Sequence, residues 1–312
     1  MYARPLALAA TAALLGSCAP HIPQYAAPAA DLPARRSPAL QPCALVHLEV
    51  DEDLSNGARG WFRGPWRQAY SSFVLRQGDR VVLIDAGLGE TTPADVDAAP
   101  WWFRLAVGNA ARPAVGLAKL LKQAGIRPEQ VTHVLLTHRH WDHTGGLREL
   151  PNARIVMARA DAEATDAQSS PFADGAMRGH FQGLQARIDR MDFDGPPLFG
   201  FAASRDVFGD GSVIAVPTPG HTPGATSYLV QADAGKPWFF IGDAAWVKEG
   251  FEEPVPKGRL ASAVADFDAD QTADTLGHLH ALHALGVAHL VTAHDARTWV
   301  QLPRCVSGAA TP

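Results

Sequence analysis

The chain has 312 residues, of which 47% are hydrophobic and 19% are charged, so it has enough apolar material for one large core. That composition argues against a disordered chain. The formal net charge is −5 and the pI is about 6.2, so no basic field exists to attract a polyanion, and nucleic-acid substrates are disfavoured.

Residues 1–17 are expected to form an export signal of the lipoprotein type. Arg4 supplies a short positive region, and the apolar stretch from Leu6 to Leu15 is too short to span a bilayer permanently. The stretch ends in Leu-Gly-Ser-Cys at positions 15–18, which resembles a bacterial lipobox, where the signal is cut and Cys18 becomes the acylated N-terminus. The alternative is an ordinary cleavable signal, which would give a soluble periplasmic or secreted protein. Both interpretations place the domain outside the cytoplasm, and a lipid at Cys18 is the membrane attachment that we expect.

Residues 18–43 are expected to form a tether, because six prolines lie among alanines and a few charges between positions 20 and 42. No second break in composition follows Pro42, and no internal repeat is present. The sequence therefore predicts one folded domain over residues 44–312.

The folded part begins with strands and continues as strands with intervening helices. Short apolar runs bounded by turn residues predict strands at 44–50, 72–75, 80–84, 131–136, 153–157, 212–216, 226–230, 238–241 and 289–292. A helix is expected at about 114–124, with Gly125 as its stop. A later helix at about 268–285 has Asp268 as a possible N-cap and Gln271 placed to complete a capping box.

Cys43 and Cys305 remain once Cys18 is assigned to acylation. In an oxidising compartment they would be able to form a disulfide that ties the two ends of the domain together, or they would be two separate thiols, and their spacing does not decide between these. Neither has the spacing partner of a zinc-thiolate site.

A histidine-rich segment follows the strand predicted at 131–136 and reads THRHWDH at positions 137–143. In extended backbone the imidazoles of His138 and His140 point to the same side, while Asp142 and His143 come from the turn that follows. A catalytic zinc needs three imidazole or carboxylate ligands and one open position. Four ligand-type residues converge here, so with three more ligands the chain would hold two ions.

Three further candidates each follow an apolar run. They are His221 in TPGHTPG, Asp243 in IGD and His294 in TAHD. Any one of them alone would be compatible with an ordinary surface or core residue. Together with the cluster at 138–143, however, they are typical of ligands gathered at strand ends, so a metal site is the favoured interpretation.

These pieces, in this order from Ile84-Asp85-Ala86-Gly87 to His294, resemble the metallo-β-lactamase superfamily. The resemblance covers most of the folded chain. It implies an α/β (α+β) fold, the four-layer αββα sandwich, and a hydrolase with two Zn²⁺ ions, although manganese, cobalt or iron suit similar ligands.

The resemblance also implies a role for each ligand. His138, His140 and His221 would hold one ion, Asp142, His143 and His294 would hold the other, and Asp243 would bridge them together with a hydroxide. That hydroxide would attack an acyl or phosphoryl centre, and Asp243 would shuttle the proton. Asp85 would orient a metal-bound histidine, as such ligands usually require.

A narrower resemblance concerns the substrate. The run at 244–253, AAWVKEGFEE, is similar to a segment of quorum-quenching N-acyl-homoserine lactonases, which open a lactone ring on a lipid-like signal molecule. Those enzymes normally carry tyrosine where this chain has Trp246, whose indole N–H donates a hydrogen bond but transfers a proton less readily. Asp243, Asp142 and Trp246 are thus the expected catalytic residues.

Aromatic residues in two insertions are candidates for an apolar pocket that would take an acyl group. They are Trp101, Trp102, Phe103, Phe172 and Phe181. For any single one of them, packing in the core or in a lid is the favoured interpretation, since aromatic side chains are usually buried.

Other functions compete with a lactonase. A class B β-lactamase has serine or cysteine where Asp243 stands, and a glyoxalase II-type thioesterase would need a basic cluster for glutathione, which we do not find. An organophosphate hydrolase would use the same metal site. A di-iron oxidoreductase would show glutamate at position 140 and an attached flavin domain. A metal-binding lipoprotein is the non-enzymatic alternative.

Overall fold

The computed structural model describes residues 20–26, 28, 31–59, 64–107, 115–233 and 235–305. The predicted signal at 1–17 and the predicted acylation site Cys18 lie outside the described residues. Within the described ranges, none of the helices is both long and apolar enough to cross a membrane.

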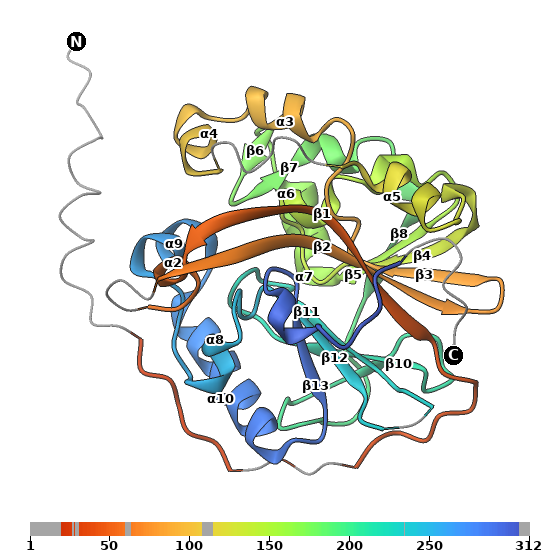
Figure 1. Ribbon diagram of the computed structural model, residues 1–312, viewed down its shortest axis with the longest axis vertical. Coiled ribbons are helices and arrows are strands. Elements are labelled where there is room, and N and C mark those ends of the chain that lie inside the picture. The colour runs from red at the N-terminus through yellow and green to blue at the C-terminus, as the bar shows by residue number, and fades with distance from the viewer. Residues whose placement is uncertain are drawn as a thin grey trace.

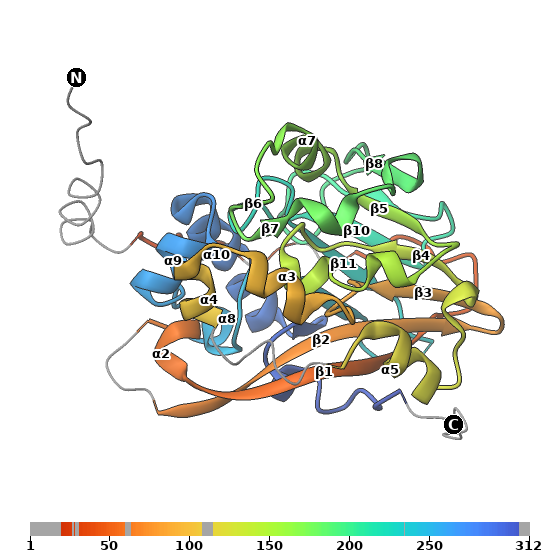
Figure 2. The same cartoon turned by 90° about the horizontal axis from the view of Figure 1, so that it is seen from above.

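Two β-sheets form the centre of the molecule (Figures 1 and 2). The first has the strand order β1-β2-β3-β4-β5-β8. Its strands are β1 (Gln41–Asp53), β2 (Pro65–Gln77), β3 (Arg80–Ile84), β4 (Val131–Leu135), β5 (Arg154–Ala158) and β8 (Ile188–Met191). The antiparallel β1–β2 pair extends well beyond the other strands, and β3, β4, β5 and β8 are parallel to one another.

The second sheet has the order β13-β12-β11-β10-β9. Its strands are β9 (Arg205–Asp206), β10 (Val213–Pro217), β11 (Thr226–Val230), β12 (Trp238–Gly242) and β13 (His289–Thr292). A separate small hairpin is formed by β6 (Phe172–Ala173) and β7 (Ala176–Met177). All nine predicted strands are present, and their boundaries coincide with the prediction or differ by one to three residues, except that β2 begins seven residues before the predicted position 72.

Three apolar layers hold the sheets and helices together. Between the sheets, Phe73 and Ile84 of the first pack with Tyr228, Phe240 and Val291 of the second. Helices α5 (Leu117–Gln123) and α7 (Arg159–Ala167) cover the outer face of the first sheet, and α10 (Ala269–Leu285) covers the outer face of the second. The predicted αββα sandwich is therefore confirmed, because each amphipathic element buries its apolar face in one of these layers.

The remaining helices are short, and most lie near one end of the sheets. They are α2 (Leu54–Gly57), α3 (Thr92–Ala98), α4 (Trp101–Val107), α6 (Trp141–Thr144), α8 (Glu249–Glu252) and α9 (Arg259–Ala265). Sequence periodicity does not reveal helices of one or two turns, since so few residues carry the pattern.

The start of α10 departs from the prediction in one respect. Asp268 is the N-cap and accepts from the backbone N–H groups of Asp270 and Gln271. The Gln271 side chain binds the Asp268 carboxylate rather than its backbone N–H, which donates to the carbonyl of Gly220 at 2.9 Å. The capping box is thus incomplete because the loop that carries His221 already takes that donor.

The proline-rich segment before β1 lies against the domain instead of extending from it. The carbonyl of Pro33 accepts from the Gln231 side chain at 2.8 Å, and Arg35 pairs with Asp233 at 2.7 Å. Leu40 is fully buried and β1 begins at Gln41, so the folded domain starts before the predicted position 44. Contacts with the β10–β11 side, which composition does not reveal, hold this segment in place.

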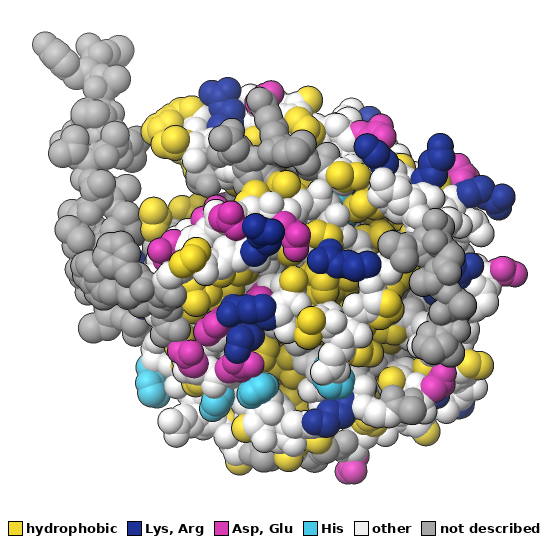
Figure 3. Space-filling model, in the orientation of Figure 1, with side chains coloured by type: hydrophobic (Ala, Val, Ile, Leu, Met, Phe, Trp, Pro, Cys, Tyr) yellow, Lys and Arg dark blue, Asp and Glu magenta, His cyan; other side chains and the backbone are white. Residues whose placement is uncertain are grey.

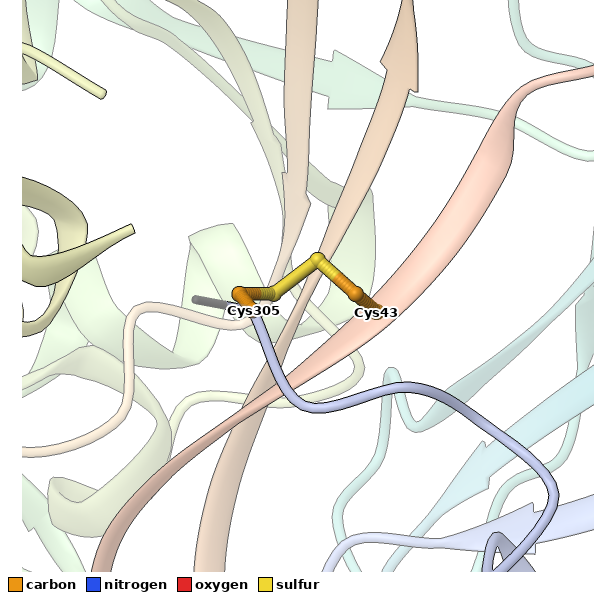
Figure 4. Close-up of a disulfide and its surroundings, with 2 residues drawn as sticks. All are labelled: Cys43 and Cys305. Atoms are coloured by element: carbon orange, nitrogen blue, oxygen red, sulfur yellow. A yellow bond between two sulfur atoms is a disulfide. The ribbon is translucent and has the colours of Figure 1, made fainter. Parts of the chain in front are cut away.

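Cys43 and Cys305 form a disulfide that joins β1 to the C-terminal segment (Figure 4). The Cys305 N–H also donates to the carbonyl of Ala44 at 3.0 Å. Of the two alternatives that the sequence leaves open, the structure has the bridge.

Candidate metal centre

The histidine-rich segment leaves β4 and enters α6 at the edge where the parallel strands end. His140 has extended backbone dihedrals, and its ring centroid lies 4.6 Å from that of His138. Asp142 and His143 belong to α6, a one-turn helix where the sequence predicted a plain turn, and His140 is its N-cap residue. The helical turn directs both side chains back toward the same point.

The loops after β10, β12 and β13 bring the other three candidates to this point. The ligand candidates form three overlapping groups of three, and within each group the ligand atoms lie within 4.8 Å of one another. The groups are His138, His140 and His221; His138, His143 and Asp243; and Asp142, His143 and His294. Asp243 lies between the outer two groups. Its Oδ2 is 3.4 Å from His221 Nε2 and 3.2 Å from His294 Nε2, and its Oδ1 is 3.3 Å from His143 Nε2. The structure thus places all seven predicted ligands in one cluster, with the two sets of three on either side of Asp243.

The donor set fits two divalent ions. The Nε2 atoms of His138, His143 and His221 and Oδ1 of Asp243 are buried and have no hydrogen-bond partner. Buried polar atoms are rarely left without a partner, so four such atoms converging on one point fit a site for a metal ion. Imidazole and carboxylate donors in two open groups of three are what dinuclear hydrolytic centres use.

Electrostatics keeps three of the ligands in the form that binds metal. Burial lowers the pKa of His138 and of His140 well below the usual value, so both imidazoles are neutral. Burial alone would raise the pKa of Asp243, but the charges of His294 and His143 outweigh it and hold that pKa well below its usual range. Asp243 is therefore an anion.

The Nδ1 atoms of three ligands have fixed partners. His143 Nδ1 lies 2.8 Å from Asp85 Oδ2, as predicted, and Asp85 also accepts from the backbone N–H of Thr137 at 2.7 Å. His294 Nδ1 donates to the carbonyl of Ala69 on β2 at 2.8 Å. His221 Nδ1 lies 2.9 Å from Asp266 Oδ1. These contacts orient each Nε2 toward the centre.

Asp266 and Lys257 are supporting residues that sequence reasoning missed. The Lys257 ammonium is 2.6 Å from Asp266 Oδ1, its side chain is 2% exposed, and Ser262 donates to Asp266 Oδ2 at 2.7 Å. Lys257 thus stabilises the Asp266 carboxylate, which in turn orients His221, a residue 36 positions away in the sequence. A lysine and an aspartate on either side of a short helix carry no local signal of burial, so only the tertiary structure reveals them.

Trp246 contacts the centre directly. Its indole N–H donates to Asp243 Oδ2 at 2.8 Å. The sequence predicts a hydrogen-bond donor at this position, and in the structure that donor orients the Asp243 carboxylate.

A cavity of about 310 Å³ opens onto the centre. Its floor includes Asp142, Asp243 and His294, and its walls include Trp102 and Phe103 of α4, Phe172 of β6, and Leu260, Ala261 and Val264 of α9. Phe103 and Phe172 pack with ring centroids 4.4 Å apart, so these aromatics both pack and line the cavity. Phe181 instead lies in the core beneath the first sheet, and Trp101 is 70% exposed.

Tyr70 places a phenol in the same cavity. It lies on β2 with its ring edge against His294, at a centroid distance of 5.2 Å, and it is buried. Burial and the nearby carboxylates of Asp142 and Glu52 raise the pKa of Tyr70 well above its usual value, so the phenol keeps its proton. Nothing in the sequence around position 70 distinguishes it from a core aromatic.

Comparison with known families agrees with this geometry, since residues 65–284 match the model of the metallo-beta-lactamase superfamily. The chain belongs to the metallo-beta-lactamase superfamily. The match spans the first sheet from β2 onward, most of the second sheet and six of the seven predicted ligands. The predicted family and the prediction of a metal-dependent hydrolase are confirmed.

Several similar proteins within this superfamily are named as N-acyl homoserine lactonases. N-acyl homoserine lactonase AttM of Agrobacterium fabrum is 33% identical over 195 residues, which is 61% of this chain and 67% of the relative. A crystal structure of a B. thuringiensis AiiA variant with bound N-decanoyl-L-homoserine has a TM-score of 0.63 and 17% identity, covering 86% of this chain and 98% of that one. An N-acyl homoserine lactone hydrolase with its product N-hexanoyl-L-homoserine has a TM-score of 0.63, 18% identity and the same coverages. The two structures show the shared fold.

Proposed function

We propose that this superfamily member holds two zinc ions and hydrolyses the lactone ring of an N-acyl-homoserine lactone. Water would add to the lactone carbonyl carbon, the ring C–O bond would break while the departing oxygen takes up a proton, and the product would be the open-chain acyl-homoserine. The observation that carries the proposal is the seven-residue cluster with unpartnered donor atoms, placed at the bottom of a cavity with apolar walls.

His138, His140 and His221 would hold one ion, Asp142, His143 and His294 the other, and Asp243 both. When bound, such ions acidify water and polarise an acyl oxygen. Asp243, anionic and oriented by the Trp246 indole, is positioned to take up the proton that the attacking water loses. The Tyr70 phenol, still protonated, supplies a hydrogen-bond donor in the cavity, which offsets the tyrosine absent at position 246.

The cavity favours an acyl substrate. Trp102, Phe103, Phe172, Leu260 and Val264 give the cavity an apolar lining beside the metal-ligand candidates and the polar Glu52, Asn56 and Gln68. A lactone headgroup at the floor would leave its acyl chain between α4 and α9. The relatives named as N-acyl homoserine lactonases support this substrate class.

We also propose that the protein is exported and anchored through Cys18. The lipobox-like sequence at 15–18 motivates this, and the Cys43–Cys305 bridge supports an oxidising compartment outside the cytoplasm.

The test combines metal analysis of the purified protein with an assay of four substrates: an acyl-homoserine lactone, a carbapenem, a thioester and a phosphotriester. We expect about two zinc ions per chain and turnover of the lactone, with a loss of about 10³-fold in His138→Ala, because the ions supply several kcal/mol to the transition state. His133→Ala, five residues earlier on β4 and outside the cluster, is the matched control and should retain activity. Rapid carbapenem hydrolysis with an inert lactone would refute the lactonase assignment.

A further inference from the structure

The mouth of the active-site cavity is surrounded by exposed apolar side chains. Of the ten large hydrophobic side chains exposed among the described residues, six belong to α4 or to α9 and the residues just after it. They are Trp101, Trp102, Leu105, Leu260, Val264 and Phe267. Leu105 is 76% exposed and Leu260 is 73% exposed, so these are full apolar surfaces and not the edges of core residues. Singly exposed hydrophobics are ordinary, but a gathered patch marks an interaction surface.

The two helices stand on either side of one opening. Trp102 and Phe103 of α4 line the cavity from one side, and Leu260 and Val264 of α9 line it from the other. Hydrophobic side chains are visible over α4 and near α9 in the space-filling view (Figure 3). Three of the six exposed residues, Trp102, Leu260 and Val264, line the cavity itself, so the patch forms a rim beside the entrance and a partner that covers it would face the cavity.

The N-terminal segment reaches the domain beside this rim. Pro20, the first described residue, lines a cleft together with Pro254 and Pro256. Pro256 lies three residues before Arg259, where α9 begins. Figures 1 and 2 both show the start of the described chain near the α8–α9 region. Cys18 precedes Pro20 by two residues, which allows about 7 Å of extended chain. An acyl group on Cys18 would consequently hold the α9 side of the domain close to a lipid surface.

We infer that α4 and the region of α9 through Phe267 form a membrane-docking surface, with the mouth of the cavity facing the bilayer. The rim side chains would enter the boundary between headgroups and acyl chains, where large apolar and tryptophan side chains are stable. The chain has a net charge of −5, so the attraction is apolar and does not require anionic lipid. A lipid on Cys18 would hold the domain so close to the bilayer that these side chains could insert to this shallow depth.

Docking has a consequence for the substrate, and this consequence rests on the proposed function. A lactone with a long acyl chain partitions into lipid, and from there it would enter the cavity tail-outward between the two helices. Docking itself is measured without substrate, so a failed lactonase assay would leave the docking result unaffected.

The experiment uses the mature protein purified from the membrane of the expressing bacterium and reconstituted in phosphatidylcholine vesicles. Lipidated Cys18 has no free thiol, and Cys43 and Cys305 are bridged, so the parent protein should take up no thiol-reactive dye. Leu105→Cys and Leu260→Cys place a polarity-sensitive dye on either side of the mouth. Val300→Cys, at a residue that is 78% exposed and does not line the cavity, is the matched control.

We expect the dyes at positions 105 and 260 to shift to shorter emission wavelengths on vesicles and to be quenched by nitroxide-labelled lipid, and the dye at position 300 to show neither effect. Water-like emission at positions 105 and 260 on vesicles would overturn the inference. So would dye uptake at Cys18 in the parent protein. A shift that appears without vesicles and grows with protein concentration would also overturn it, because a second copy of the chain would then cover the patch.

Discussion

The floor and the mouth of the cavity are built in opposite ways. At the floor, the seven predicted ligands are all buried, and the Nδ1 atoms of His143, His221 and His294 each face a fixed partner. At the mouth, Leu105 and Leu260 are more than 70% exposed and lie on helices of only seven residues.

The difference follows from where each region comes from in the chain. The floor consists of residues that follow β4, β10, β12 and β13, so the sheets fix their positions. The mouth consists of segments between β3 and β4 and between β12 and β13, and several of its apolar side chains, such as Leu105 and Leu260, are exposed. The candidate metal ligands are thus held by the sheets, which are the rigid part of the fold. The residues proposed to contact the substrate and the membrane lie on connecting segments, which tolerate more change in sequence and length.

If contacts from buried neighbouring residues make the floor rigid, removing one of these neighbours should have the largest effect on stability and on zinc affinity. Lys257→Met leaves the Asp266 carboxylate buried without its cation, and we expect a loss of about 3–5 kcal/mol in the free energy of unfolding, measured by urea denaturation. Lys257→Met with Asp266→Asn removes both charges and should recover most of that stability. Zinc affinity, measured by competition with a chelator, should still fall about 10–100-fold in the double variant, because His221 loses its orienting carboxylate.

The matched control for this pair is Lys248→Met with Glu252→Gln, which removes an ion pair on the surface of α8. It should change stability by no more than about 0.5 kcal/mol and leave zinc affinity unchanged. A double variant at 257 and 266 that binds zinc as tightly as the parent would show that the buried pair supports folding alone.

Removing the disulfide tests whether the stability of the domain can fall without a change in zinc binding. Replacing Cys43 and Cys305 by alanine opens a loop of 262 residues, and we expect a loss of about 2–5 kcal/mol in the free energy of unfolding. The zinc content at 25 °C should not change, because neither cysteine contacts a predicted ligand. Loss of zinc from a folded variant would mean that the floor depends on the termini more than its local contacts suggest.

His47 makes the stability of the folded domain sensitive to acid. It is buried, with Nδ1 2.9 Å from the carbonyl of Val115 and Nε2 3.0 Å from the Ser72 hydroxyl, and burial lowers its pKa to about 4. Its folded pKa is below the unfolded value of about 6.5, so its contribution is complete above pH 6.5 and is lost as the pH falls toward 4. The shift corresponds to about 3 kcal/mol.

We therefore expect His47→Gln to have a flatter stability profile than the parent between pH 6.5 and 4, in urea unfolding of metal-depleted protein. The exposed His283 on α10 provides the control variant His283→Gln, whose profile should follow that of the parent. Parallel profiles for His47→Gln and the parent would refute this role.

The smallest effect is expected at the mouth. Phe172→Ala shortens one apolar wall, and we expect KM for a long-chain acyl-homoserine lactone to rise about tenfold, with little change in kcat or in KM for a short chain. Phe208→Ala, at a partly buried phenylalanine far from the cavity lining, is the control. An equal effect on long and short chains would place the acyl group elsewhere.

Much of this architecture could be predicted from sequence because its signals are local. The nine strands show as short apolar runs, and ligand-type residues such as His138 and Asp243 directly follow such runs. Tyr70, Lys257 and Asp266 could not be predicted as members of the site, since each resembles an ordinary strand, loop or helix-flanking residue until the chain folds. The path of the proline-rich segment along the domain depends on distant partners such as Gln231 and Asp233 and was equally out of reach.

The most direct test of the dinuclear centre is a crystal structure of the purified protein with anomalous diffraction measured on both sides of the zinc absorption edge. We predict two zinc peaks, one among His138, His140 and His221 and one among Asp142, His143 and His294, with Asp243 between them. A single peak, or a map in which His221 or His294 turns away from the cluster, would contradict the account.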